Sequence, residues 1–315
     1  MGNKVTIIGA GSVGSTIAYT MVVKGIASEI VLIDINKEKA LGEAMDIYQG
    51  VLYASPAKVY AGEYADAVGS DIVVVTSGIA RKPGQTRLDL AQTNVNITKS
   101  IMGEIVKYAP DAIYVIVSNP VDVLTYECIK ISGIPEKHII GSGTSLDTAR
   151  LCATLAERYQ IDAKSVHATV YGEHGDSSFV PWSLAKIDSV PVDDYEASLV
   201  EKPAEMPALD HAEVEDFVRK SGGIVIKRKG ATFHAIAATV SNLCACILNG
   251  VNTILTVSSM MHGEYGIEDV CLSMPTVIGR DGFVNRIVAP LTEEEIALMH
   301  KSAESLKEVI SNIQF

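Results

Sequence analysis

The sequence predicts an α/β protein in which a doubly wound parallel sheet is followed by an α+β domain. Three observations predict this fold. Short apolar runs alternate with amphipathic helical patterns over about the first 140 residues, a glycine-rich turn joins the first run to the first helix, and the rhythm changes after about residue 145. Alternating strands and helices of this kind form a parallel sheet that helices cover on both faces.

The strands expected in the first half are β-branched and apolar, without the polar alternation of a half-exposed sheet. They lie at Lys4–Ile8, Glu29–Ile33, Lys58–Ala61, Asp71–Thr76, Ile113–Ser118 and His138–Gly141. The amphipathic stretches between them lie at Ser15–Lys24, Glu38–Gln49, Leu88–Tyr108 and Val121–Ser132. Because crossovers between parallel strands are right-handed, this order favours a Rossmann-type sheet.

The second half has a different mixture of elements. Helices are expected at Asp147–Tyr159, Ala212–Arg228, Phe233–Leu248 and Glu293–Ile310, and strands at Val166–Val170, Asn252–Ser258, Val270–Ile278 and Phe283–Ile287. A polar, proline-punctuated stretch covers Val190–Asp210. We therefore expect two domains, residues 1–142 and 143–315. Their interface should be rigid, because the sequence shows no flexible linker between them.

The composition excludes several classes of function. The chain of 315 residues is 48% hydrophobic and carries a formal charge of −12, so the phosphates of a nucleic acid would repel it. No apolar run in the sequence reaches the roughly 18 residues of a membrane span. The five cysteines are scattered and odd in number. They indicate neither a disulfide framework nor a metal site, and they favour a reducing cytoplasm.

The glycine-rich turn has the spacing of a dinucleotide site. Gly9, Gly11 and Gly14 follow the first strand directly and open a helix. Gly9 permits the tight turn, Gly11 lets the backbone approach a pyrophosphate, and Gly14 lets the helix pack against the strand. The free N–H groups of the helix N-terminus, where Val13 lies, complete an anion site. The motif alone is weak, since a plain strand–turn–helix or a methyltransferase that binds a nucleoside cofactor has a similar turn.

The strand after this helix ends in an acidic residue, Asp34, which lies twenty residues after Gly14. A carboxylate at this position accepts both ribose hydroxyls of a dinucleotide and repels a 2′-phosphate. The expected cofactor is therefore NAD rather than NADP.

Reduction of a keto acid requires a proton donor for the carbonyl oxygen, a charge that polarises this oxygen, and an anchor for the carboxylate. A histidine suits the proton transfer, and an aspartate on its second ring nitrogen fixes the tautomer. An arginine binds a carboxylate through two parallel hydrogen bonds. A second arginine on a mobile loop can polarise the carbonyl and exclude water.

Candidates for each role are present. His174 lies between glycines in a turn after a strand, and Asp147 and Arg150 lie three residues apart on one helix face. Arg87 follows a polar loop that leaves the fourth strand at its carboxyl end, the edge where ligands bind in open α/β sheets. Taken singly, each candidate has a structural alternative, namely a turn histidine, a surface ion pair or a solvated basic loop.

Together these segments resemble the NAD-dependent L-lactate/malate dehydrogenases over essentially the whole chain, and the lactate-type members most closely. The resemblance rests on GAGSVG, RKPGQTRLDL, SNPVDVLTY, GSGTSLDTAR, YGEHGDSS, KGATF and LTVSS followed by YGIEDVCLSMP. It implies that His174 donates and accepts the proton and that Asp147 orients it. It further implies that Arg150 binds the substrate carboxylate and that Arg87 polarises the carbonyl.

The resemblance also assigns the surroundings of these residues. Asn119 would contact both the substrate oxygen and the nicotinamide, Thr232 would line the substrate pocket, and Gly78 would lie against the cofactor. The family further implies an ordered mechanism in which NADH binds first, a homotetramer or dimer, and a place in glycolysis and fermentation. No nucleic-acid, membrane or metal partner is expected.

Arg81 leaves the choice of substrate open. Malate-type members carry an arginine immediately before K-P-G, whereas lactate-type members carry a glutamine. An arginine would pair with the second carboxylate of oxaloacetate through a charge-assisted hydrogen bond of about 1.5–3 kcal/mol. Leu88, Thr232 and the segment GSGT are lactate-like. We therefore favour pyruvate and L-lactate, with oxaloacetate and malate as the alternative and a non-catalytic NAD sensor as a remote one.

Cys152 departs from the family pattern at a position that concerns regulation. Family members that fructose 1,6-bisphosphate activates share His167 but carry an arginine where this chain has Cys152. The loss of that cation implies weak or absent activation.

Overall fold

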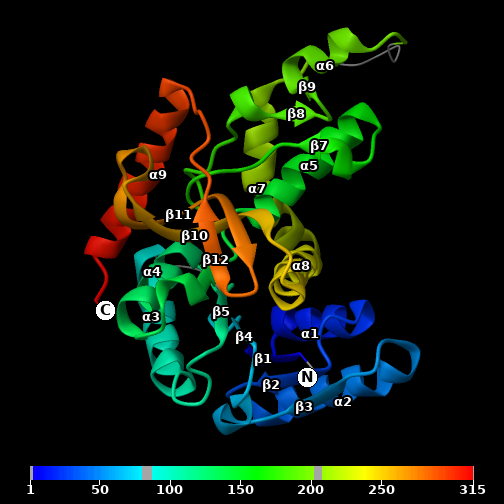
Figure 1. Ribbon diagram of the computed structural model, residues 1–315, viewed down its shortest axis with the longest axis vertical. Helices are drawn as coiled ribbons and strands as arrows, with labels where there is room; N and C mark the ends of the chain where they lie inside the picture. Colours follow the sequence, from blue (N-terminus) through cyan, green and yellow to red (C-terminus); the bar gives the residue numbers. More distant parts are fainter. Residues whose placement is uncertain (1–2, 80–86, 202–207, 315) are drawn as a thin grey trace.

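The computed structural model describes residues 3–79, 87–201 and 208–314, which are organised around one large sheet (Figure 1). Within these residues its nine strands lie in the order β12-β11-β10-β6-β5-β4-β1-β2-β3. They are β1 Lys4–Ile8, β2 Glu29–Ile33, β3 Lys58–Ala61, β4 Ile72–Val75, β5 Ile113–Ile116, β6 Ile139–Gly141, β10 Thr253–His262, β11 Glu268–Gly279 and β12 Gly282–Arg286. β1 pairs in parallel with both β2 and β4, so the strand order reverses there. Ligands of open α/β sheets bind at the carboxyl edge beside such a reversal.

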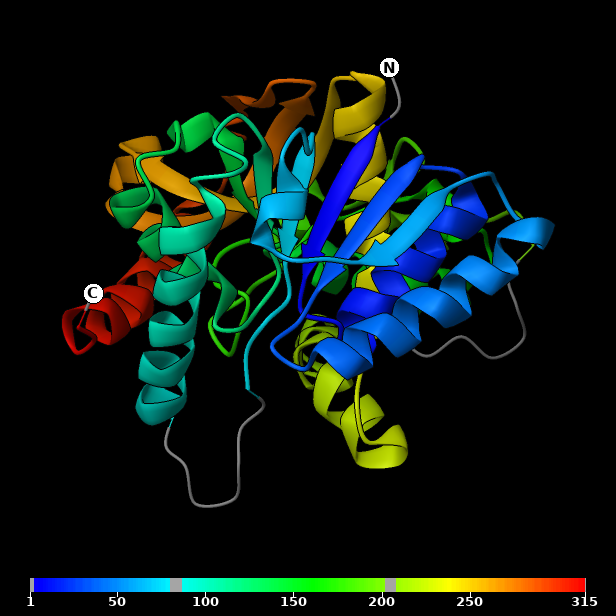
Figure 2. The ribbon, with the colours of Figure 1, turned by 90° about the horizontal axis from the view of Figure 1, so that it is seen from below.

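Helices cover both faces of this sheet (Figure 2). They are α1 Ser12–Lys24, α2 Lys37–Gln49, α3 Arg87–Ile105, α4 Val121–Ile131, α5 Ser145–Tyr159, α6 Val192–Ser198, α7 His211–Lys229, α8 His234–Asn249 and α9 Glu293–Ser311. Side chains of β4 alternate between the faces: Ile72 and Val74 join a core with α1, α2 and α8, whereas Val73 and Val75 join a core with α3, α4 and α9. The predicted doubly wound sheet is confirmed. None of the described helices is both long enough and apolar enough to cross a membrane.

The strands of the second half extend the same sheet instead of forming a separate large one. β10 runs antiparallel to β6 with Ser258 opposite Gly141, and β11 and β12 continue the sheet outward. The expected domain boundary at residues 142 and 143 lies just after β6, inside this continuous sheet, and stays a prediction. The second half has a third apolar core of its own between α5 and α7, around Leu151 and Val218.

The largest local differences from expectation lie between residues 166 and 210. The expected strand Val166–Val170 is shortened to β7, Val166–His167, which pairs with β8, Lys186–Ile187; β8 in turn pairs with β9, Val190–Pro191. Helix α6 forms inside the polar, proline-punctuated stretch Val190–Asp210, for which no element was expected. These elements span only 2 to 7 residues, which is too short for a periodic pattern.

Candidate active site

The glycine turn joins the end of β1 to the start of α1. Gly9 has a φ of +105°, and a Cβ there would come within 2.7 Å of the Thr76 hydroxyl oxygen. A Cβ at Gly14 would lie 1.8 Å from the carbonyl oxygen of Gly9, so only glycine permits this packing. At Gly11, by contrast, a Cβ would meet no described atom within 4 Å. The turn is therefore closely packed at Gly9 and Gly14 and open at Gly11.

The open side of the turn fits the pyrophosphate of a dinucleotide. Gly11 is the N-cap of α1 and has no side chain to accept from the first N–H groups of the helix, among them that of Val13. These unpaired donors and the helix dipole favour an anion beside the helix N-terminus. A side chain at Gly11 would fill the space that the phosphates need.

Asp34 lies directly after β2, beside the glycine turn. Its Oδ2 accepts a hydrogen bond from the N–H of Ala10 at 2.7 Å, and its Oδ1 accepts one from the N–H of Asn36 at 2.8 Å. These two bonds fix the carboxylate relative to the turn. Each oxygen keeps a lone pair for a hydroxyl, so Asp34 and the turn together fit the ribose and pyrophosphate of NAD.

Asn94, which was not among the predicted site residues, joins two predicted cofactor positions. This side chain is 2% exposed on α3. Its amide donates to the Asn119 carbonyl at 2.7 Å, and its Oδ1 accepts from the N–H of Ile79 at 2.9 Å. A Cβ at Gly78 would come within 3.2 Å of the same Oδ1. A polar residue at a buried helical position was the signal that could have identified it.

The structure brings His174, Asp147 and Arg150 together as predicted. Nδ1 of His174 lies 2.5 Å from Oδ2 of Asp147, and Nη1 of Arg150 donates to the other oxygen, Oδ1, at 2.9 Å. The side chains of Asp147, Arg150 and His174 are 7%, 14% and 25% exposed. Asp147 and Arg150 on α5 therefore form a largely buried ion pair, and His174 binds the other carboxylate oxygen of Asp147. This burial excludes the alternative of a solvent-exposed surface ion pair.

This arrangement determines the protonation of the cluster. Burial would lower the pKa of His174, but the charge and hydrogen bond of Asp147, helped by Asp122, raise it to about 9. Burial would raise the pKa of Asp147, but His174 and Arg150 hold it below its ordinary value. At neutral pH the carboxylate is ionised and the imidazole is protonated.

Two threonines hold α5 against the segment that leads into the His174 turn. The Thr144 hydroxyl donates to the carbonyl of Val170, and the Thr148 hydroxyl accepts from the N–H of Val170 at 2.9 Å. Both backbone groups of Val170 are thereby bonded to the start of α5, one to its N-cap residue Thr144 and the other to its first turn. Because Asp147 lies in this turn, the same contacts set its position relative to His174.

Gly222, which was not among the predicted site residues, makes room for Arg150. It lies in the interior of α7, and a Cβ there would come within 3.3 Å of Nη2 of Arg150. Gly223 follows it, and a Cβ at Gly223 would meet no described atom within 4 Å. Glycine costs about 1 kcal/mol in a helix interior, so the Gly-Gly pair was a readable sign of a close contact.

The remaining predicted residues are placed to different extents. Asn119 is exposed and precedes α4, and its Oδ1 accepts from the N–H of Val121 at 3.3 Å. Thr232 is half-buried in the connection between α7 and α8, and among the described residues it has no hydrogen bond to the His174 cluster. Arg87 begins α3, but its side chain lies outside the described residues, as does the whole of Arg81.

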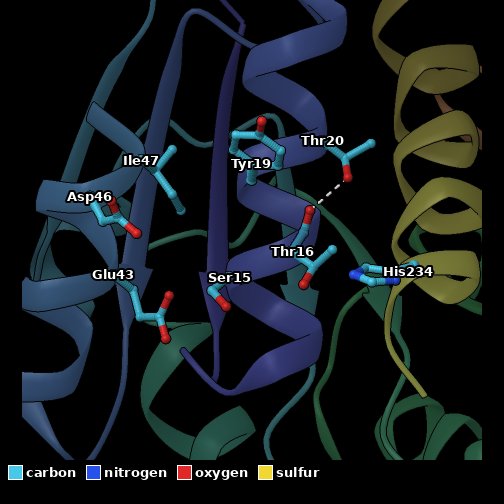
Figure 3. Close-up of a pocket in the computed structure, with 8 residues that line it drawn as sticks. All are labelled: Ser15, Thr16, Tyr19, Thr20, Glu43, Asp46, Ile47 and His234. Atoms are coloured by element: carbon cyan, nitrogen blue, oxygen red, sulfur yellow. Dashed lines mark hydrogen bonds between the residues drawn. The ribbon is translucent and has the colours of Figure 1, made fainter. Parts of the chain in front are cut away.

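A pocket of about 390 Å³ opens between α1, α2 and the first residue of α8 (Figure 3). Its α1 wall carries hydroxyls that each donate to the backbone carbonyl four residues earlier, and its α2 wall carries carboxylates: Ser15, Thr16, Thr20, Glu43 and Asp46. His234 faces them. The described residues of the predicted site do not line this pocket, so we assign it no part in the chemistry.

Comparison with known protein families covers almost the whole chain. Residues 3–141 match the lactate/malate dehydrogenase, NAD binding domain. Residues 144–314 match the lactate/malate dehydrogenase, alpha/beta C-terminal domain.

Individual relatives are similar over their full length. An L-lactate dehydrogenase of Thermoanaerobacter sp. (strain X514) is 47% identical over 311 residues, which cover 99% of both chains. An L-lactate dehydrogenase of Acetivibrio thermocellus is 46% identical over 312 residues, which cover 98% of this chain and 97% of the relative. The solved structure of a minor L-lactate dehydrogenase from Enterococcus mundtii has a TM-score of 0.94 at 36% identity and covers 99% of both chains. A lactate dehydrogenase from a Medee basin deep-sea metagenome library has a TM-score of 0.94 at 37% identity and covers 100% of both chains.

Proposed function

This chain belongs to the lactate/malate dehydrogenase family, and from that premise we propose that it is an NAD-dependent L-lactate dehydrogenase, which reduces pyruvate to L-lactate. The carboxylate of Asp147 carries the proposal, because it holds the ring of His174 with one oxygen and the guanidinium of Arg150 with the other. A protein that only sensed NAD would not need an acid anchor joined to a proton donor.

Arg150 anchors the substrate. One of its terminal nitrogens bonds to Asp147, and the planar guanidinium has further N–H donors that fit a carboxylate through parallel hydrogen bonds. Because the side chain is largely buried, water competes weakly for these donors. The bond to Asp147 thus sets the distance between the bound carboxylate and the imidazole.

His174 moves the proton. NADH, when bound, supplies the hydride that goes to the carbonyl carbon of pyruvate. Nδ1 of His174 is bonded to Asp147, so Nε2 is the nitrogen that gives its proton to the carbonyl oxygen. The ring becomes neutral in this step, and Asp147 stays ionised. In the reverse direction the neutral Nε2 accepts the hydroxyl proton of L-lactate.

The other predicted residues complete the proposed site. Arg87 would polarise the carbonyl, and Asn119 would contact the substrate oxygen and the nicotinamide. The bond between Asn94 and Asn119 supports this, because it joins Asn119 to the segment that holds Gly78. Thr232 would line the pocket.

Malate dehydrogenase activity is the second candidate, and Arg81 is the observation that favours it. An arginine over the methyl group of pyruvate would be an unpaired charge, whereas it would pair with the second carboxylate of oxaloacetate. An arginine has a long side chain that can reach solvent instead, and the similar relatives are L-lactate dehydrogenases, so we keep pyruvate as the proposed substrate.

Steady-state kinetics with pyruvate and oxaloacetate test both candidates, on the wild type, on Arg81→Gln and on Lys82→Gln as a control that removes a neighbouring charge. We expect the wild type to have the higher kcat/KM for pyruvate. Arg81→Gln should lower kcat/KM for oxaloacetate roughly tenfold to hundredfold, and Lys82→Gln should change it little. A wild-type preference for oxaloacetate would make the protein a malate dehydrogenase, and no NADH oxidation with either acid would leave only a sensor.

We also propose a homotetramer or dimer in the cytoplasm. Large apolar side chains are exposed on α2 and on the turn that follows it, at Leu41, Met45, Tyr48, Leu52 and Tyr53. Contiguous exposed apolar surface marks protein interfaces. The cysteines are free thiols, as a reducing compartment requires. Light scattering measures the assembly, and a monomer at working concentration would contradict this part.

A further inference from the structure

A second carboxylate, that of Asp122, bonds to His174 from a different element than Asp147 does. Its Oδ2 accepts from the backbone N–H of His174 at 2.8 Å, and its Oδ1 accepts from the Ser258 hydroxyl at 2.5 Å. Asp122 is 3% exposed and Ser258 is fully buried. Both oxygens are thus engaged inside the protein, and the carboxylate joins α4, β10 and the His174 turn.

The His174 turn is held through consecutive backbone N–H groups. Gly172 donates to a carbonyl on β11, Glu173 donates to a hydroxyl on α9, and His174 donates to Asp122 on α4. Asp122 is the charged acceptor of this set, and hydrogen bonds to an ionised acceptor are the strong ones. The bond at His174 is therefore the charge-assisted one among these three backbone bonds.

Asp122 also lies in the first turn of α4, directly after the segment that contains Asn119. The N-terminus of a helix stabilises a negative charge. Burial raises the pKa of Asp122 to about 6, and the bonds from Ser258 and from the backbone of His174 oppose this rise. The carboxylate is therefore ionised at neutral pH, where the imidazole is protonated.

We propose that Asp122 is a positioning residue for the proton transfer: it ties the backbone of His174 to the helix turn that follows Asn119, and it places a second negative charge near the imidazole. The proposal rests on the proposed function, because it names a further group that serves His174. It assigns Asp122 no contact with the substrate.

The effect of Asp122 on the pKa of the His174 ring adds to the effects of the other charged groups around it. Asp147 and Arg150 face it from α5 and Asp122 faces it from α4, while Glu173 precedes it in the turn. Burial and Arg150 lower the pKa of His174, and Asp147 and Asp122 raise it. Removing the charge of Asp122 should therefore lower the pKa of the ring and move the alkaline limit of pyruvate reduction to lower pH.

Two variants separate position from charge. Asp122→Asn keeps an acceptor for the N–H of His174 and removes the charge. Asp122→Ala removes both and leaves the N–H of His174 and the Ser258 hydroxyl without their acceptor. We expect Asp122→Ala to lower kcat/KM for pyruvate by roughly tenfold or more, because a buried donor loses its partner. Asp122→Asn should lower it by less than about threefold at neutral pH, with the alkaline limb shifted down.

The ring pKa itself is measured by NMR titration of the His174 Cε1–H signal in the cofactor-free protein, assigned by its loss in His174→Asn. It should fall by about half a unit or more in Asp122→Asn. This readout needs no turnover. If the wild type reduced neither keto acid, the proposed function would fail, while the titration would still decide the role of Asp122.

Glu295→Gln is the matched control, because Glu295, like Asp122, is a buried carboxylate with both oxygens hydrogen-bonded. Glu295 accepts two bonds from Ser183 and takes part in the capping box at the start of α9. It should lower Tm and leave the ring pKa of His174 unchanged. The proposal is overturned if Asp122→Asn leaves the ring pKa where it is in the wild type, even with a lower Tm, or if Asp122→Ala keeps kcat/KM for pyruvate within about twofold.

Discussion

The glycine turn and the His174 cluster are held in different ways. The turn at Gly9–Gly14 is contiguous backbone, and its carboxylate, Asp34, is bonded to backbone N–H groups. The His174 cluster is made of ionisable side chains from α5 and from the turn after Val170, with Asp147 between two cationic groups. One region offers fixed donors to a ligand, and the other changes its protonation during the reaction. We therefore expect a substitution in the glycine turn to impair cofactor binding, and a substitution in the His174 cluster to impair catalysis with cofactor binding retained.

We expect Asp147→Asn to separate catalysis from cofactor binding most strongly. Without the charge, the imidazole loses the partner that keeps it protonated, and Arg150 loses its bond. We expect kcat/KM for pyruvate to fall about 10²- to 10⁴-fold, while the Kd for NADH stays within about twofold. Steady-state kinetics and a fluorescence titration with NADH measure the two constants. Asp162→Asn, at an exposed capping position in the same half, is the control, and a parallel loss of NADH affinity would contradict the separation.

Gly14→Ala should instead impair the binding of NADH. The added Cβ would overlap the carbonyl oxygen of Gly9 at 1.8 Å, so the turn must move. We expect NADH to bind at least about tenfold more weakly and the free energy of unfolding to fall by about 2–4 kcal/mol. Gly42→Ala on α2 is the control, because a Cβ there meets no described atom within 4 Å, and it should stabilise by up to about 1 kcal/mol. Unchanged NADH binding in Gly14→Ala would show that the turn is not the cofactor site.

The pH dependence of the reaction should report on the His174 cluster. The pKa of His174 is raised to about 9, so pyruvate reduction, which uses the protonated ring, should fall as pH rises through that value. Lactate oxidation uses the neutral ring and should rise through the same range. The stabilisation from the raised pKa is fully present below the ordinary histidine value of about 6.5 and is lost as pH rises through about 9. Profiles of kcat/KM and of Tm against pH check both, and a pyruvate limb near the ordinary histidine pKa would contradict the raised value.

The smallest effect is expected from a pair of glycines on α7. Gly222→Ala and Gly223→Ala gain the same helix propensity of about 1 kcal/mol, but only the first places a Cβ within 3.3 Å of Arg150. Gly222→Ala should raise KM for pyruvate by about twofold to tenfold, and Gly223→Ala should leave KM unchanged. Equal KM values in both variants would mean that Gly222 does not position the guanidinium.

The glycine turn was the easier region to predict from sequence, because its parts are neighbours in the chain. Lys4–Ile8 and Glu29–Ile33 match the observed strands at both ends. The spacing of Asp147 and Arg150 predicted one helix face, and the two side chains are bonded. The pairing of both with His174 followed from the chemistry of a keto acid and from the family resemblance. It could not follow from spacing, because the residues lie on separate elements.

The residues that support this cluster could not be predicted in the same way. Asp122 lies just after Pro120 at the start of a helix, where an acid is common, so no pattern in the chain indicates that it reaches His174. Ser258 is a small polar residue in a strand, and its bond to Asp122 depends on how β10 pairs with β6. Such contacts arise only when distant elements pack, and the continuity of the sheet across the expected domain boundary escaped prediction for the same reason.

NADH oxidation in the presence of pyruvate, by the wild type and by His174→Asn, tests the proposed chemistry most directly. We expect turnover by the wild type, at least about a hundredfold lower kcat/KM in the variant, and equal affinity of both proteins for NADH. Equal turnover by the two proteins, or a wild type that binds NADH and leaves pyruvate unreduced, would contradict the assignment of His174 as the proton donor.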